Sequence, residues 1–324
     1  MDQKVAREFS SFPGFPTARA SRFAVILAGG DGSRLRSLTR AIAGDELPKQ
    51  FCPILGDKTL LDKTRERVRL TIPAENTYFS LTQKHEKFYR VPLWDVRPDQ
   101  LVIQPENKGT APAILYSLFR LAAKDPKATV AFFPSDHYFS HDEAFMDCVD
   151  FAFRAAELNP GSVVLLGIEP DKVETSYGWI EPAESLFGDM KGSVSPVKRF
   201  WEKPSSSAAK KLMASGCLWN SFVMIGRVDA FLKMFRDHLP DAFRMFETSK
   251  RMFGGSQERT LIRAIYSWLP ETNFSSAILE KATDRLMVMR VGDVGWCDWG
   301  EPSRVLGTLA GLGIRPDWAH ALAA

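Results

Sequence analysis

The chain has 324 residues and a formal net charge of +3, and 45% of its residues are apolar and 25% charged. This composition is ordinary for a soluble globular protein and allows a large buried core. The first 22 residues hold four basic and two acidic side chains, so the remainder of the chain is nearly neutral. That balance excludes an obvious basic face for nucleic acid, and no apolar run approaches the length of a membrane span. We therefore expect neither nucleic acid nor a membrane as a partner.

The N-terminal segment, the cysteines and the absence of a linker indicate how the chain is organised. Residues 1–21 are rich in Ser, Pro, Gly and Arg and lack the hydrophobic centre of a secretory signal, which predicts a flexible arm. The four cysteines have no metal-type spacing, so we expect reduced thiols and a cytoplasmic protein. Residues 22–324 contain no Ser/Gly/Pro linker and are expected to form one domain, with a helical segment from about residue 302.

The most informative segment lies near the start of this domain. The apolar run from Phe23 to Ala28 predicts a buried parallel strand. Gly29, Gly30 and Gly32 follow at once, and Arg34 comes directly after them. Glycines let the backbone approach a ligand, and bare N–H groups beside a guanidinium suit a phosphate chain. A simple strand-to-helix turn is the alternative. The glycine spacing fits neither a P-loop nor a dinucleotide-binding turn.

Strand-like and helix-like segments alternate through the first half of the chain. The alternation implies right-handed crossovers and a mostly parallel sheet with helices on both faces. Ligands bind such sheets at the carboxyl ends of the strands, and both Gly29 and Asp136 come just after a predicted strand. After the first strand, the expected elements are a helix over 59–70, strands over 77–82 and 101–104, a helix from 113, a strand over 128–133, a helix around 145–153 and a strand over 162–168.

The second half of the chain is less regular. Its first two strands read as a β-rich insertion, and the pattern then returns to alternating elements. The expected elements are strands over 177–181 and 197–202, a helix over 208–213, a strand over 218–225, helices from 229 and over 258–268, a strand over 286–291 and a terminal helix over 302–312.

Asp136 is a candidate metal ligand because it follows the strand predicted over 128–133. A carboxylate in this position can hold Mg²⁺ together with substrate phosphate oxygens and water. The alternative is an Asp that caps the next helix. The apolar residues at helical spacing, however, begin only near Glu143. His137 and His141 could form a zinc site with Asp136, although no further close ligands accompany them.

Other polar residues are weaker candidates when each is taken alone. Lys49 follows the glycine segment and could swing onto phosphates, while a solvated loop lysine is the alternative. Asp293 and Asp298 are equal candidates for a second carboxylate. Glu202 and Lys203 end a predicted strand and combine an acceptor for sugar hydroxyls with a donor to phosphate. Asn220 adds a short amide side chain next to the aromatic side chain of Trp219.

Taken together and in this order, these segments resemble the sugar-phosphate nucleotidyltransferases, and most closely the mannose-1-phosphate guanylyltransferases. The resemblance runs from residue 23 to about 306 and implies a Rossmann-like, GT-A-like α/β fold. That fold has a mostly parallel central sheet, helices on both faces and a β-rich insertion that binds the sugar. The matching segments are residues 27–35, 48–51, 109–113, 134–137, 177–178, 202–204, 218–221 and 295–298.

The resemblance also implies a reaction: GTP and mannose 1-phosphate give GDP-mannose and pyrophosphate. The sugar phosphate attacks the α-phosphorus in line, without a protein nucleophile. Arg34 and Lys49 are the implied catalytic residues, and Asp136 and Asp298 the implied ligands of Mg²⁺. The implied nucleotide-binding residues are Leu27, Ala28, Gly29, Gly30, Gly32, Ser33, Arg34, Gly109, Thr110 and Asp136. The implied sugar-phosphate-binding residues are Gly178, Glu202, Lys203 and Asn220.

The chain departs from the family pattern at two places. Arg36-Ser37 stands where the family usually has Trp-Pro, and Ser275-Ser276 replaces an acidic stretch. The second change would weaken the metal site or alter the substrate. Another hexose-1-phosphate nucleotidyltransferase, or a non-catalytic nucleotide-sugar-binding regulator, is therefore the alternative function. The chain also lacks the cupin-like or hexapeptide-repeat extension of some relatives, so we expect no fused activity. A homodimer is left open as the assembly.

Overall fold

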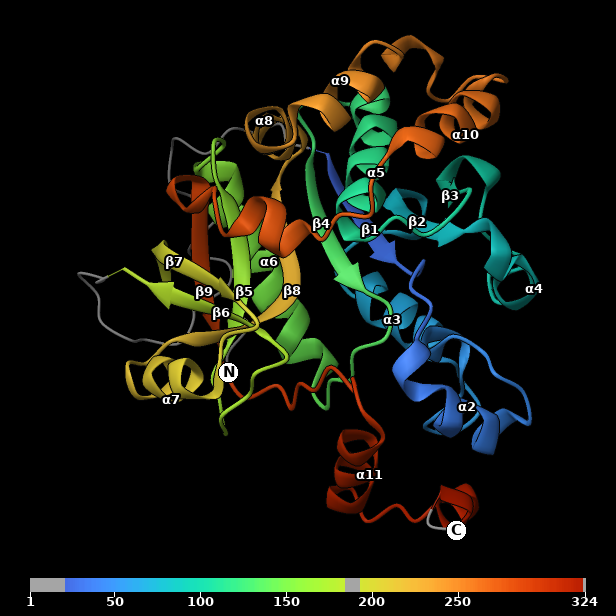
Figure 1. The fold of residues 1–324 in the computed structure, drawn as a ribbon, viewed down its shortest axis with the longest axis vertical. Helices are drawn as coiled ribbons and strands as arrows, with labels where there is room; N and C mark the ends of the chain where they lie inside the picture. The colour runs from blue at the N-terminus through green and yellow to red at the C-terminus, as the bar shows by residue number, and fades with distance from the viewer. Residues whose placement is uncertain (1–20, 184–192, 323–324) are drawn as a thin grey trace, which may run out of the picture.

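One mixed β-sheet organises the molecule. The computed structural model describes residues 21–183 and 193–322, and within them nine strands pair in the order β3-β2-β1-β4-β8-β5-β9-β7-β6 (Figure 1). The strands are β1 (Arg22–Leu27), β2 (Thr77–Thr82), β3 (Leu101–Gln104), β4 (Thr129–Pro134), β5 (Val163–Ile168), β6 (Gly178–Pro182), β7 (Val194–Glu202), β8 (Leu218–Arg227) and β9 (Leu286–Val291).

Strand directions follow the sequence prediction in the first half of the chain. Strands β1 to β4 are mutually parallel, and β5 pairs in parallel with β9. Between these two parallel groups lies β8, which is antiparallel to both β4 and β5. The hairpin of β6 and β7 joins the same sheet, because β7 pairs with β9 and β6 with β8. The expected β-rich insertion is thus an extension of the central sheet.

Helices cover both faces of the sheet (Figure 1). One hydrophobic cluster packs α5, α8, α9 and α10 against the sheet, and another packs α3 and α6 against the opposite face. The helices are α2 (Arg36–Ala43), α3 (Leu60–Arg69), α4 (Glu86–Tyr89), α5 (Thr110–Lys124), α6 (Asp142–Leu158), α7 (Ser206–Ala214), α8 (Val228–His238), α9 (Pro240–Glu247), α10 (Glu258–Trp268) and α11 (Pro302–Gly311).

Strand β1 shows why its sequence is apolar throughout. Phe23 and Val25 belong to the cluster on one face, whereas Ala24 and Ile26 belong to the cluster on the other. A strand covered on both sides needs apolar residues at every position rather than at alternate positions. This arrangement leaves the loop after Leu27 at the carboxyl edge of the sheet, beside the end of β4.

The predicted elements correspond closely to the observed ones. Strands β2, β3 and β9 have the expected bounds, and α11 begins at Pro302. The sequence did not predict α2, α4 or α9, nor the π-helical turn Ser275–Leu279. No helix in the described part of the chain is long and apolar enough to cross a membrane. Residues 1–20 of the expected N-terminal arm lie outside the described residues.

Candidate active site

The glycine loop after β1 is held in shape by buried side chains. The amide Nε2 of Gln50 donates to the carbonyls of Ala28, at 3.0 Å, and Gly30, at 2.8 Å. Gly32 has φ +58°, and a Cβ there would lie 2.7 Å from the backbone nitrogen of Lys49. A side chain at this position would be both strained and obstructed. Gln50 belongs to the matching segment 48–51, but no role was predicted for it from the sequence.

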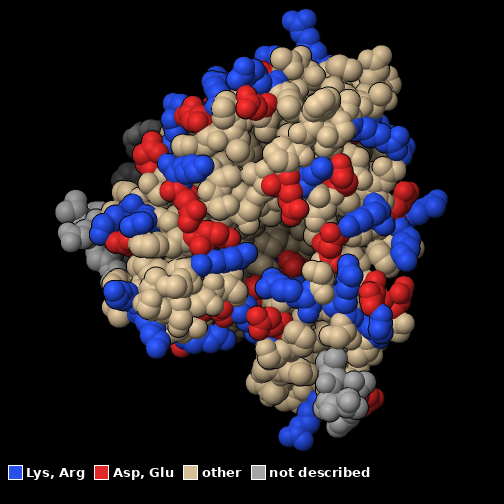
Figure 2. Space-filling model, in the orientation of Figure 1, with Lys and Arg blue, Asp and Glu red and all other residues tan. Residues whose placement is uncertain are grey.

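A pocket of about 250 Å³ opens beside this loop. The molecule is also visibly hollowed near the end of β4, with both acidic and basic side chains around the rim (Figure 2). The pocket contains six of the expected nucleotide-binding residues, namely Leu27, Gly29, Gly30, Gly109, Thr110 and Asp136. It also contains residues that were not expected there: Ser80, Gln104, Asn107, Ala113, Pro134, His137 and Phe222.

The N-terminus of α5 forms one wall of the pocket. Gly109 has φ +84°, and a Cβ there would lie 2.5 Å from the carbonyl oxygen of Thr272. The hydroxyl of Thr110 accepts a hydrogen bond from the backbone N–H of Phe274 at 2.8 Å. The N–H of Ala111 donates to the Thr272 carbonyl at 3.0 Å. Residues far apart in the sequence therefore fix this wall.

Lys49 joins the two expected metal ligands. Its side chain is buried, and its Nζ lies 3.0 Å from Oδ2 of Asp136. The same Nζ donates to the carbonyls of Asp298, at 2.5 Å, and Trp299, at 3.0 Å. The alternative of a solvated loop lysine is therefore wrong. A backbone bridge between Tyr138 and Cys297 holds the same two segments together.

The carboxylate of Asp298 is held by three hydrogen bonds, all of which end on one oxygen. Its Oδ1 accepts hydrogen bonds from the Tyr177 hydroxyl at 2.7 Å, from Arg304 Nη1 at 2.7 Å and from the Gly300 N–H at 2.9 Å. Oδ2 receives no hydrogen bond from the residues that the structure describes. Asp293, the equal candidate from the sequence, is exposed, and among the described residues it accepts a hydrogen bond only from the N–H of Gly295, at 3.2 Å.

The electrostatics of the pair favour two ionised carboxylates. Burial acts to raise the pKa of Asp136, but Lys49 and His137 outweigh it and lower that pKa. Burial also acts to raise the pKa of Asp298, and His137, Tyr177 and Arg304 lower it. Burial lowers the pKa of His137 to about 4, so its ring is neutral at pH 7 and Nδ1 can accept the N–H of Trp296 at 3.2 Å.

This donor set fits Mg²⁺ better than zinc. Magnesium needs only one or two carboxylates from the protein when substrate phosphates supply further oxygens. Asp136 and Asp298 offer two carboxylates with lowered pKa values, and Oδ2 of Asp298 accepts no hydrogen bond from the described residues, whereas Oδ2 of Asp136 is paired with Lys49. No group of three or more His, Cys, Asp or Glu residues within ranges 21–183 and 193–322 could hold a metal. The zinc site with His137 and His141 is therefore wrong.

The pocket lining does not include the expected site residues Arg34, Gly178, Glu202, Lys203 and Asn220. Arg34 is exposed on a 3₁₀ turn, Ser33–Leu35, and pairs with no described residue. Gly178 and Glu202 face each other across the β6–β7 hairpin, and burial raises the pKa of Glu202. Lys203 is exposed at the end of β7, with φ +48°. Asn220 is buried on β8, and its Oδ1 accepts the N–H of Phe222, which lines the pocket.

The fold and site define an α/β protein with a small-molecule pocket at the carboxyl edge of its sheet and two ionised carboxylates beside the pocket. A family model described as nucleotidyl transferase matches residues 23–308, and the chain belongs to that family.

The chain is also similar to curated relatives and to a solved structure. The chain is 31% identical over 295 residues to a mannose-1-phosphate guanylyltransferase of Escherichia coli K12, covering 87% of this chain and 59% of that protein. It is 29% identical over 289 residues to the alginate biosynthesis protein AlgA of Pseudomonas aeruginosa, covering 87% and 57%. The chain thus spans less than two thirds of these relatives. A crystal structure of a mannose-1-phosphate geranyltransferase from Thermus thermophilus superimposes with a TM-score of 0.74 and 30% identity, covering 86% of this chain and 76% of that one.

Proposed function

We propose that this chain is a mannose-1-phosphate guanylyltransferase, which converts GTP and mannose 1-phosphate to GDP-mannose and pyrophosphate. The observation that carries the proposal is the position of Lys49, whose Nζ contacts both Asp136 and the backbone of Asp298. That contact ties the segment that carries Asp136 to the segment that carries Asp298, beside a pocket lined by Gly29, Gly30 and Asp136. The names of the similar proteins supply the choice of base and sugar.

The phosphate chain of the nucleotide would lie along the loop after β1. Backbone N–H groups of Gly29, Gly30 and Ser33 would donate to the β- and γ-phosphates, since glycine permits the close approach. Arg34 would add a guanidinium from the 3₁₀ turn, where no described carboxylate competes for it. Leu27, Ala28 and Gly32 complete this segment by setting the shape of its backbone.

The chemistry would proceed by in-line displacement at the α-phosphorus. An oxygen of the sugar phosphate attacks, a P–O bond to the leaving pyrophosphate breaks, and no covalent enzyme intermediate forms. Lys49 would stabilise the charge that develops on the α-phosphate. Asp136 and Asp298 would hold Mg²⁺, which supplies further neutralisation of phosphate charge when it is bound.

The base and the sugar would lie on opposite sides of the phosphates. Thr110 and the backbone at Gly109 would face guanine on the α5 side of the pocket. Gly178, Glu202 and Asn220 would surround the mannose, and Lys203 would contact its phosphate. Ser275, which stands where the family has an acidic residue, contacts Glu202. A cytoplasmic location and a homodimer stay predictions from the sequence.

Pyrophosphate release tests this proposal. The protein is incubated with Mg²⁺ and each of four nucleoside triphosphates against a panel of hexose 1-phosphates, with a no-enzyme blank for every pair. We expect release to be greatest with GTP and mannose 1-phosphate. Release with a different pair would reassign the base or the sugar. Tight binding of GDP-mannose without release from any pair would favour the non-catalytic regulator instead.

A further inference from the structure

The regular pairing of strand β8 is interrupted near its beginning. Its register with β5 runs as far as Met224 and resumes at Asn220, so the three residues 221–223 stand opposite the single residue Leu166. A bulge of this kind bends the strand and changes the direction of the side chains within it. Bulges are frequent beside active sites for that reason. Phe222 is the central residue of this bulge.

The backbone of Phe222 lies in the left-handed region, with φ +61°. This conformation is rare for a bulky side chain, because the Cβ atom comes too close to the neighbouring carbonyl. In the described part of the chain, the only other non-glycine residues with positive φ are Lys203 and Trp299. Both belong to segments of the candidate active site. Strained residues cluster at functional sites, so the strain at Phe222 points to a function.

Two neighbouring side chains hold Phe222 in this conformation. Oδ1 of Asn220 accepts the N–H of Phe222 at 3.1 Å. The Ser221 hydroxyl donates to the Leu166 carbonyl at 2.7 Å and accepts the N–H of Val223 at 3.2 Å. Both side chains are buried. They satisfy backbone groups that the bulge removes from the regular ladder, so the turn is fixed before any substrate binds.

The bulge places Phe222 at the wall of the nucleotide pocket, where Pro134 and Asp136 also lie. The antiparallel register of β4 and β8 ends at the pair of Phe132 and Met224. Phe222 comes two residues beyond that pair and is therefore level with Pro134, at the carboxyl end of β4. The side chain is next to the segment that carries the first of the two carboxylates.

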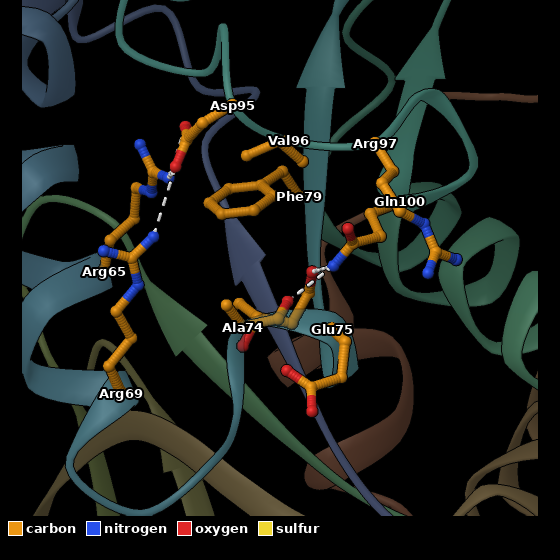
Figure 3. A pocket seen from close by; sticks show the side chains of 10 residues that line it. Arg65, Arg69, Ala74, Glu75, Phe79, Asp95, Val96, Arg97 and Gln100 are labelled. Carbon is orange, nitrogen blue, oxygen red and sulfur yellow. Dashed lines mark hydrogen bonds and ion pairs between the residues drawn. The ribbon is translucent and has the colours of Figure 1, made fainter.

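An aromatic residue can line a cavity without such strain. Phe79 lines a separate cavity of about 270 Å³ between α3 and β2, together with Arg65 (Figure 3). It lies in regular parallel pairing with β1 and β3. The Arg65 guanidinium carbon is 5.6 Å from the centre of its ring. Regular strand geometry is therefore sufficient to put a phenylalanine in a cavity wall, and the bulge at Phe222 adds a direction that a regular strand does not provide.

We propose that Phe222 is a specificity-determining residue for the sugar phosphate, and that its ring limits the size of the sugar that reaches Asp136. This role rests on the proposed function. Asn220, which would contact the sugar, is two residues away and fixes the Phe222 backbone. The pocket has about 250 Å³, whereas small-molecule sites usually have about 300–1,000 Å³, so a ring in its wall takes a large share of the space. A hexose with a bulky substituent is therefore excluded.

Pyrophosphate release with two matched sugars tests the proposal. The sugars are the hexose 1-phosphate that the substrate panel selects and its 2-acetamido analogue, each with the same nucleoside triphosphate. The unaltered protein should favour the smaller sugar in kcat/KM by about tenfold or more, which a pocket wall achieves for one small group. In Phe222→Gly and Phe222→Ala this preference should be lost. The KM for the nucleotide should not change, because its phosphates lie along the loop after β1.

The two variants also separate specificity from a purely structural role. Phe222→Gly should melt at a higher temperature than Phe222→Ala, because glycine adopts φ +61° without strain. Both should nevertheless lose the same sugar preference, which a structural role alone would not alter. Phe151→Ala, which truncates a half-exposed phenylalanine on α6, is the matched control and should keep the preference.

An unchanged sugar preference in both Phe222 variants would overturn the proposal. A change confined to the KM for the nucleotide would also overturn it, because the ring would then act on the base. Failure of the proposed function gives a different pattern, in which no pair of substrates releases pyrophosphate.

Calorimetry tests Phe222 in that case, with GDP-mannose and the GDP derivative of N-acetylmannosamine. The unaltered protein should bind GDP-mannose about tenfold more tightly or better, and Phe222→Gly should bind the two alike. Equal binding of both by the unaltered protein, or binding of neither, would contradict the role of Phe222.

Discussion

The buried ammonium of Lys49 lies 3.0 Å from the carboxylate of Asp136. Its other two contacts are backbone carbonyls of Asp298 and Trp299, in the loop that follows β9. Asp136 follows β4, so a single side chain connects the ends of two strands. Since an ammonium group with three acceptors has little freedom, Lys49 ties the loop that carries Asp136 to the backbone of the loop that carries Asp298 before any substrate arrives.

Asp136→Asn should reduce kcat for pyrophosphate release by about 10²–10³, because one charged anchor of the reacting phosphates is lost. The isosteric amide keeps the shape of the site but removes the partner charge of the buried Lys49, so the free energy of unfolding should fall as well. Steady-state kinetics with GTP, mannose 1-phosphate and Mg²⁺ measure the effect. Asp171→Asn, which alters an exposed carboxylate in the loop after β5, serves as the control. Unchanged turnover in Asp136→Asn would remove Asp136 from the chemistry.

Lys49→Met should reduce activity and also stability. From the sequence we would expect little change in stability, because a loop lysine is normally solvated. The structure shows instead that two carbonyls and a carboxylate would lose their donor, which we expect to cost about 2 kcal/mol of the free energy of unfolding. Urea unfolding measures this loss, with the half-exposed Lys58→Met as the control. A variant as stable as the original protein would show that these contacts contribute nothing to folding.

The fold could be predicted largely from local patterns. Strands β1 and β2 are short apolar runs bounded by polar or glycine-rich segments, and α5 shows helical spacing of Ile114, Leu118 and Leu121. Strand direction is a different matter. The apolar pattern of β8 is the same whether the strand runs with β4 or against it, so its antiparallel pairing carries no local signal.

The site was predictable only where its residues cluster in sequence. Gly29, Gly30 and Asp136 follow apolar runs, and the carboxyl edge of a parallel sheet brings them together. The burial of Lys49 could not be predicted, because its carbonyl partners lie 249 and 250 residues further along the chain. Gln104 was missed for a similar reason, since its contact with Tyr266 joins β3 to α10.

Gly109→Ala should destabilise the α5 wall of the nucleotide pocket. The new Cβ would lie 2.5 Å from the Thr272 carbonyl in a residue with φ +84°, so both strain and a clash arise. We expect a loss of about 2–4 kcal/mol in the free energy of unfolding and weaker GTP binding. Gly216→Ala is the matched control, because φ is +71° there and no atom lies within 4 Å of the added Cβ. It should cost only about 1 kcal/mol. Equal melting temperatures for the two variants would contradict the clash.

Arg304→Met should lower the stability of the fold and disturb the position of the Asp298 carboxylate. Arg304 is buried on α11 and donates to Asp298 at 2.7 Å and to Glu174 at 2.6 Å. Both partners are largely buried, so removal of the cation leaves two unpaired carboxylates and should cost about 3 kcal/mol of the free energy of unfolding.

The same variant should lower kcat about 10–100-fold, the scale expected for losing a group that orients a metal ligand. Tyr177→Phe removes one neutral donor to the same oxygen and should have a smaller effect on both quantities. Arg244→Met is the control for charge, because its pair with Asp241 is exposed and contributes less than about 1 kcal/mol. Urea unfolding and Mg²⁺-dependent kinetics together separate the two roles. If Arg304→Met lost stability but kept the kcat and Mg²⁺ dependence of the original protein, Arg304 would support the fold alone, and Asp298 would not need it for orientation.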